Sequence, residues 1–143
     1  MKSLARTFAL LAWALWLGGL IATFISVLTL FRARPNDLSV FDVAAPRIFH
    51  AFEMYQLILA TVAIVSTFFW KKPILLLLFS FAAIGSIVSP LVITPQIARL
   101  QRLGQTHTPR FAQVHGESMM IYSTDATILL VAGLFIPRAM KLK

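Results

Sequence analysis

The chain has 143 residues, of which 59% are hydrophobic and 13% charged, and its formal net charge is +8. This length excludes two ordinary domains, and the apolar content lies above that of soluble globular proteins. The absence of cysteine from the sequence excludes disulfides and thiolate metal sites. We therefore expect a single domain over residues 1–143, in the class of polytopic membrane proteins.

Four apolar runs have the length, roughly 20 residues, that is needed to cross a bilayer. The first run follows a short basic start, but it is too long for the core of a signal peptide, so we expect it to be retained as a helix. The runs predict an all-α bundle of four transmembrane helices over residues 7–32, 46–70, 73–95 and 109–136. The lipid bilayer is therefore the first expected partner.

Prolines and a short loop set the predicted helix ends. Pro46 suits the first position of the second helix, and residues 38–45 before it form a short amphipathic segment that should lie on the membrane surface. The connection at 71–72 is so short that the second and third helices must be antiparallel neighbours. Pro90 removes one backbone hydrogen bond and predicts a kink in the third helix, and Pro137 should end the fourth.

The two halves of the sequence share an order of features. Each half has an apolar helix, a basic segment, a Pro-Arg pair, a histidine and a glutamate before a second apolar helix. These residues are Pro46-Arg47, His50 and Glu53 in the first half, and Pro109-Arg110, His115 and Glu117 in the second. A duplicated helical hairpin and coincidence explain this order equally well. Duplication would relate the halves by an axis along the membrane normal and would place His50 and His115 at the same depth.

Positive charge is divided almost evenly between the two sides of the membrane. The side with both termini and the 71–72 connection holds seven Lys and Arg residues, and the other side holds six. The positive-inside rule therefore favours cytoplasmic termini by one residue, in a membrane of the bacterial inner-membrane type. The basic residues stand singly or in pairs, without a continuous patch, so we expect no nucleic-acid partner.

Small residues recur at four-residue spacing on two helices, where they would allow close helix packing in lipid. These stripes are Gly18, Ala22 and Ser26 on the first helix, and Ala82, Ser86 and Pro90 on the third.

Polar residues form a stripe on each of two helices. The second helix carries His50, Glu53 and Gln56, and the fourth carries His115, Ser118, Tyr122 and Asp125. In an up-down-up-down bundle these helices are parallel and diagonal, so both stripes can point to the centre. Ionisable groups inside hydrocarbon are costly and are functional candidates by default. Asp125, in the middle of an apolar run, is the clearest of them.

Three functional hypotheses use these residues. In the first, His50 and His115 are the two axial ligands of a haem b. In the second, His50, Glu53, His115 and Glu117 hold a transition-metal ion, because mixed imidazole and carboxylate sites suit such metals. In the third, the polar groups form a proton or cation path that ends at Asp125.

A purely structural interpretation stands beside these hypotheses. Glu53 and Glu117 lie in the first turns of their helices, where the helix dipole favours an anion, and each can pair with the arginine that follows the nearby proline. Asp125, hydrogen-bonded to Ser86 or Gln56, can hold helices together without any other role. The chain would then be an accessory or scaffold subunit of a membrane complex, or one copy of a homo-oligomer.

Motifs of hydrolytic or nucleotide-dependent enzymes are missing from the sequence, which contains no phosphate loop and no Ser-His-Asp arrangement. We therefore favour a protein without enzymatic activity. The preferred expectation is that it binds or moves a metal or other cation through its His and carboxylate cluster, with the haem subunit and the scaffold subunit as alternatives.

Several short motifs occur in a recognisable order. They are Trp16-Leu17-Gly18-Gly19, Phe49-His50, Thr94-Pro95, and Phe111 with His115-Gly116 and Ser118. In this order they resemble the family of small four-helix membrane proteins that includes transmembrane protein 205, a domain of unknown function. The first motif is also similar to copper-resistance membrane proteins of the D type. The resemblance implies the four-helix fold and matches His50 and His115 to the family's motif positions, but it implies no catalytic residues.

Overall fold

The computed structural model describes residues 2–33 and 39–141, and nearly all of these are helical. The helices are α1 (Lys2–Ala33), α2 (Ser39–Trp70), α3 (Pro73–Val88), α4 (Thr94–Arg102) and α5 (Pro109–Lys141), and a π-helical segment, η1 (Ser89–Ile93), joins α3 to α4. Four stretches are long and apolar enough to cross a membrane: Lys2–Leu30, Pro46–Trp70, Pro73–Arg102 and Pro109–Lys141. The predicted all-α protein with four transmembrane helices is confirmed.

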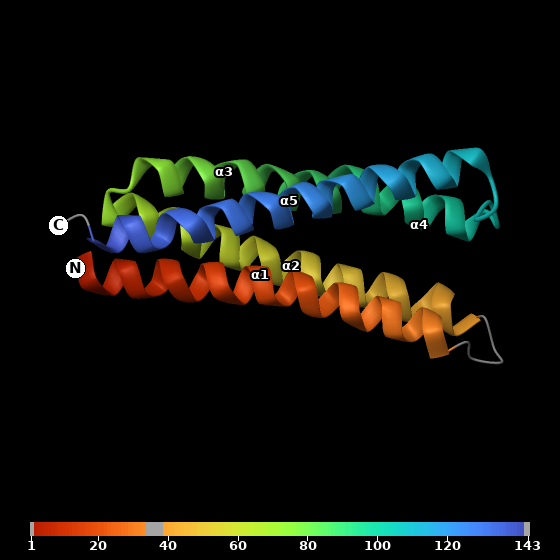
Figure 1. Cartoon of the computed structure of the whole chain (residues 1–143). Coiled ribbons are helices and arrows are strands. Elements are labelled where there is room, and N and C mark those ends of the chain that lie inside the picture. The colour runs from red at the N-terminus through yellow and green to blue at the C-terminus, as the bar shows by residue number, and fades with distance from the viewer. Residues whose placement is uncertain (1, 34–38, 142–143) are drawn as a thin grey trace.

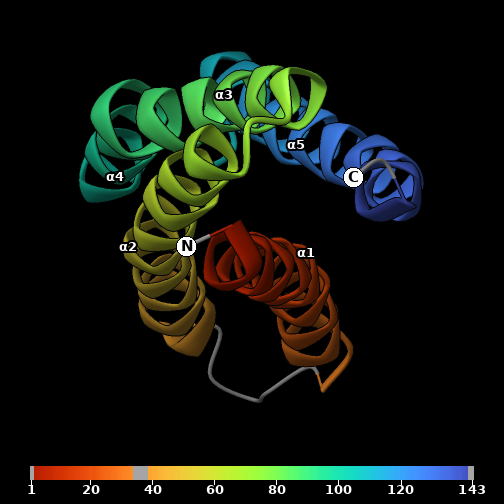
Figure 2. The same cartoon turned by 90° about the vertical axis from the view of Figure 1, so that its left-hand side faces the viewer.

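The four long helical rods run alternately up and down. Both chain ends lie at the same end of the bundle as the α2–α3 connection, and the α4–α5 connection lies at the opposite end (Figure 1). Viewed along the bundle, α1 packs beside α2, α2 beside α3, and α3 beside α5 (Figure 2). This arrangement places α2 and α5 on a diagonal, as predicted, so that side chains from both helices can meet in the middle.

Two prolines predicted to mark helix ends lie inside helices. α2 begins at Ser39, so Pro46 lies inside the helix. The segment that was predicted to lie on the membrane surface therefore forms the start of α2 from residue 39 onward, and Leu38 lies outside the described residues. α5 continues past Pro137 to Lys141, and the buried side chains of Ile136 and Ala139 flank that proline. A proline removes only one helical hydrogen bond, and burial of the flanking residues offsets that loss at Pro137.

The packing face of α1 also differs from the prediction. Gly18, Ala22 and Ser26 are exposed on the outside of the bundle, whereas Ala12 and Trp16 are buried. The Trp16 ring stacks on Phe79 of α3 with ring centroids 6.5 Å apart, and the indole N–H of Trp13 donates to the Leu129 carbonyl of α5 at 2.8 Å. Aromatic side chains, which the small-residue rule ignores, therefore decide which face of α1 points inward. On α3 the predicted face is the buried one: Ala82 and Ser86 are fully enclosed.

The tight connection between α2 and α3 contains a strained residue. Lys71 adopts φ 61°, a left-handed conformation that costs a non-glycine residue about 1 kcal/mol. We expect Lys71→Gly to raise the free energy of unfolding by about 0.5 kcal/mol, because the relief of strain exceeds the added flexibility of the unfolded chain. Thermal unfolding in mild detergent measures this change. Lys72→Gly removes the same charge at an ordinary φ of −113°, and it should not stabilise the protein.

Candidate functional site

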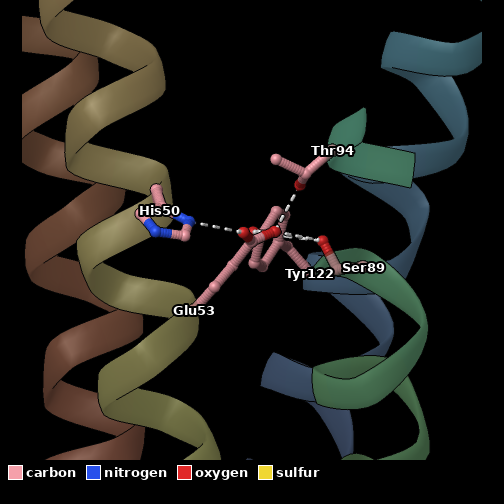
Figure 3. A network of polar contacts seen from close by, with 5 residues as sticks. All are labelled: His50, Glu53, Ser89, Thr94 and Tyr122. Atoms are coloured by element: carbon pink, nitrogen blue, oxygen red, sulfur yellow. Dashed lines mark hydrogen bonds and ion pairs between the residues drawn. The ribbon is translucent and has the colours of Figure 1, made fainter. Parts of the chain in front are cut away.

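A carboxylate lies at the centre of the polar side chains inside the bundle. Glu53, on α2, is fully buried. Its Oε1 atom accepts a hydrogen bond from Ser89 at 2.8 Å, one from Tyr122 at 3.3 Å, and one from Thr94. These three hydroxyls come from η1, α5 and α4, so the Glu53 carboxylate joins three other parts of the fold (Figure 3). We call Glu53 and these three hydroxyl residues the Glu53 site.

The π-helical segment explains why two of the hydroxyls meet on one oxygen. Ser89 and Thr94 are five residues apart, and in an α-helix this spacing would turn their side chains about 140° away from each other. In η1 the Thr94 N–H donates to the Ser89 carbonyl five residues earlier, which is the π-helical pattern. The wider turn brings Ser89 and Thr94 onto the same face, toward Glu53 (Figure 3). The disturbance predicted at Pro90 is therefore this π-helical turn.

His50 connects the Glu53 site to the surface of the protein. It lies one turn before Glu53 on α2, with its Nδ1 atom 3.9 Å from Oε2 of Glu53, and its side chain is 68% exposed. That carboxylate oxygen is buried and has no hydrogen-bond partner among the described residues. Glu53 therefore has one oxygen held by hydroxyls and a second oxygen turned toward an exposed imidazole.

Aromatic rings fix the position of the Tyr122 hydroxyl. The Tyr122 ring packs against Phe49 and Phe52, with centroid distances of 5.7 and 6.2 Å. Both phenylalanines flank His50 and Glu53 on α2, and Tyr122 is almost fully buried. These contacts hold two diagonal helices together and aim the hydroxyl at Oε1 of Glu53.

Asp125 lies deeper in the bundle and lacks the partners that were predicted for it. Its side chain is buried, and its Oδ2 atom has no hydrogen-bond partner among the described residues. Ser86, one predicted partner, donates instead to the Ala82 carbonyl of its own helix at 3.3 Å. Gln56, the other predicted partner, is fully buried with neither amide atom paired within the described part of the chain. Ser118, from the same predicted stripe, is buried as well.

His115, at the outer end of the predicted stripe on α5, and Glu117 make local contacts on their own helix. The exposed His115 ring stacks on Phe111 at 6.0 Å, and Glu117 accepts a hydrogen bond from Gln113 at 2.9 Å. Arg110, a predicted partner of Glu117, binds Gln96 and Gln113.

The predicted metal ligands are therefore not gathered into one cluster. Across residues 2–33 and 39–141, no group of three or more His, Asp or Glu side chains is placed to hold a metal ion. The four-ligand metal site and the haem between His50 and His115 stay predictions.

The sequence predicted that the buried polar residues include Glu53, Gln56, Tyr122 and Asp125. It did not predict that Ser89 and Thr94 supply two of the three hydroxyls that donate to Glu53. Ser89 and Thr94 each precede a proline, at Ser89-Pro90 and Thr94-Pro95. Two such steps five residues apart indicate a widened helical turn, because each proline removes one α-helical hydrogen bond. That spacing was the signal that could have identified both residues.

Comparison with known proteins gives one match. Residues 11–106, more than half of the chain, match the family described as a domain of unknown function (DUF4149). No curated protein and no solved structure matches the chain. The expected domain of unknown function is thus found, whereas nothing in these comparisons links the chain to transmembrane protein 205 or to copper-resistance proteins of the D type. The matched range contains Glu53, Ser89 and Thr94 and ends before Tyr122.

Proposed function

The chain belongs to the DUF4149 family, and we propose that it is a membrane protein that binds a cation at Glu53 and moves it through the bundle. The observation that carries this proposal is the Glu53 carboxylate itself. Glu53 is fully buried, and its Oε1 atom accepts hydrogen bonds from three hydroxyls. Its Oε2 atom has no hydrogen-bond partner in the described part of the chain and faces the exposed His50.

The charge balance of the bundle supports a cationic ligand. No Lys or Arg lies between Arg47 and Lys71 in the second span, or between Arg110 and Arg138 in the fourth. A buried carboxylate is costly unless a positive charge or a proton neutralises it. Since these stretches of α2 and α5 supply no fixed positive charge, a mobile one is the natural partner of Glu53.

The donor atoms favour a proton or a small singly charged cation over a transition metal. The Glu53 site offers carboxylate and hydroxyl oxygens, which are ligands for hard cations. One carboxylate balances one positive charge. His50 is the only imidazole among the described residues that the structure places beside it, and it can relay a proton between the surface and Glu53.

The test is ion movement by the full-length protein in liposomes. Proton entry is followed with an enclosed pH-sensitive dye and sodium entry with radioactive sodium, each under a potassium diffusion potential. We expect Glu53→Gln, which keeps the shape and removes the charge, to reduce movement of the carried ion by at least about tenfold, the equivalent of about 1.4 kcal/mol.

The matched control is Glu117→Gln, which makes the same chemical change at a carboxylate that accepts a hydrogen bond from the exposed side chain of Gln113. It should leave ion movement within about twofold of the unchanged protein, because an exposed polar pair contributes less than about 1 kcal/mol. Ion movement that survives Glu53→Gln would contradict the proposal. Equal losses in both variants would instead favour the predicted ligand set that includes Glu117.

A further inference from the structure

A second polar layer lies one helical turn deeper than the Glu53 site. On α2, Gln56 comes three residues after Glu53, and on the parallel α5, Asp125 comes three residues after Tyr122. On the antiparallel α3, Gly85 comes four residues before Ser89. A Cβ atom built on Gly85 would lie 2.7 Å from Oδ2 of Asp125, so α3 and α5 touch at this level.

α1 borders this layer on its deeper side. A Cβ atom built on Gly19 would lie 2.8 Å from the Tyr55 ring and 3.2 Å from the Phe52 ring, which sets the register between α1 and α2. Because α1 runs antiparallel to α2, Trp16 lies one turn deeper than Gly19. The Trp16 ring stacks on Phe79, which comes six residues before Gly85 on α3, so Trp16 borders the layer of Gln56 and Asp125 on its deeper side. Its side chain is fully buried.

Four polar atoms in or beside this layer are buried and have no hydrogen-bond partner among the described residues. They are Nε1 of Trp16, Nε2 and Oε1 of Gln56, and Oδ2 of Asp125. Roughly 90% or more of buried polar groups in proteins are paired with protein or with ordered water, and an unpaired group calls for an explanation such as a bound water or ion. Four such atoms on three helices of a small bundle therefore point to a bound ligand inside it.

The chemistry of these atoms selects the ligand. Two are N–H donors, which cannot coordinate a metal cation, and two are oxygen acceptors, one of them on a carboxyl group. Water both donates and accepts, and a buried water makes about three hydrogen bonds to groups of this kind. The carboxyl group of Asp125 needs a proton or a cation to neutralise it, and the N–H donors disfavour a metal cation.

We infer that Gln56 and Asp125, bordered by Trp16 on the deeper side, form a layer that holds internal water and carries a proton between Asp125 and Glu53. A water-borne proton binds the Asp125 carboxylate to give the acid, and the same proton leaves to water when the carboxylate is restored. The titratable groups that face this layer are Glu53 and Tyr122, with His50 beyond Glu53. The inference rests on the proposed function and specifies its cation as the proton.

Two measurements on the full-length protein test this layer. In the liposome assay, Asp125→Asn and Gln56→Leu should each lower proton entry by at least about tenfold, with no sodium entry in any variant. Thr127→Val is the control on α5, because Thr127 is exposed and its hydroxyl donates only to the Ser123 carbonyl of the same helix. The second measurement is infrared spectroscopy of the unchanged protein, which should show a carboxylic-acid band that shifts in D2O and disappears in Asp125→Asn.

The outcomes separate this inference from the proposed function. Sodium entry that depends on Glu53 and survives both Asp125→Asn and Gln56→Leu would overturn the inference and leave the cation site at Glu53 intact. The absence of any carboxylic-acid band that shifts in D2O would also overturn it, because water would then reach no protonated carboxyl group in the bundle, and this readout requires no folded variant. Proton and sodium entry that are both unaffected by Glu53→Gln would overturn the proposed function itself.

Discussion

Gly85→Ala should lower the free energy of unfolding by about 2 kcal/mol, within the range for an added methyl group in a packed interior. The new Cβ would lie 2.7 Å from Oδ2 and 2.9 Å from Cγ of Asp125, and it would also clash with Oδ1. These distances are shorter than van der Waals contact, so α3 and α5 must separate or the Asp125 side chain must turn. Asp125 is buried on all sides, which makes either movement costly.

Steric trapping or thermal unfolding in mild detergent measures this effect, with Gly18→Ala as the matched control. Gly18 also lies inside a helix, but a Cβ built there meets nothing within 4 Å. The control should be neutral or stabilise by up to about 1 kcal/mol, since alanine favours helix more than glycine does. The double variant Gly85→Ala with Asp125→Ala should recover part of the loss, because it removes the clashing group. Equal stability of the two single variants would show that α3 and α5 do not meet at this contact.

The spans and the two polar stripes could be predicted because each depends on one local pattern. Apolar runs of bilayer length identified all four spans. The three-residue spacing of Glu53 and Gln56 on α2 placed both side chains in the interior. The same reasoning predicted that Tyr122 and Asp125 on α5 are buried, because an up-down topology makes α2 and α5 diagonal and parallel.

The remaining features depend on contacts that a local pattern does not contain. Ser89 and Thr94 share a face only because η1 is wider than an α-helix. Pro137 lies inside α5 because the packing of its neighbours outweighs one lost hydrogen bond. α1 turns Trp16 inward rather than Gly18 because Phe79 of α3 offers a ring to stack on. The positions of Pro137 and Trp16 required knowledge of the neighbouring helices, whereas the two proline steps at Ser89 and Thr94 could have indicated the wider turn.

Replacement of Glu53 by alanine should have the largest effect on stability, a loss of about 2–4 kcal/mol. Glu53→Ala removes one acceptor from three hydroxyls, on Ser89, Thr94 and Tyr122. Hydrogen bonds between helices in membrane proteins contribute about 0.6 kcal/mol on average and up to about 1.7 kcal/mol each. Buried hydroxyls left without an acceptor add a further cost. Because the three hydroxyls lie in η1, α4 and α5, the loss should loosen the bundle at the His50 end.

Glu53→Gln separates this structural role from the proposed binding of a cation. Glutamine keeps an acceptor oxygen for the hydroxyls and removes the charge, so its stability should fall by only about 1 kcal/mol, the typical net contribution of one hydrogen bond. Its ion movement should nevertheless be lost. Tyr122→Phe, which deletes one hydroxyl, should cost a similar amount of stability but reduce ion movement less than Glu53→Gln does, because Ser89 and Thr94 still hold Oε1. Unfolding midpoints and liposome assays on the same preparations provide this comparison.

If Glu53→Gln and Glu53→Ala destabilise equally, the hydroxyls do not depend on an oxygen at residue 53. If Tyr122→Phe abolishes ion movement as completely as Glu53→Gln, the Tyr122 hydroxyl is as necessary for ion movement as the Glu53 charge. The cation would then be bound by the hydroxyl oxygens of the Glu53 site together with the carboxylate.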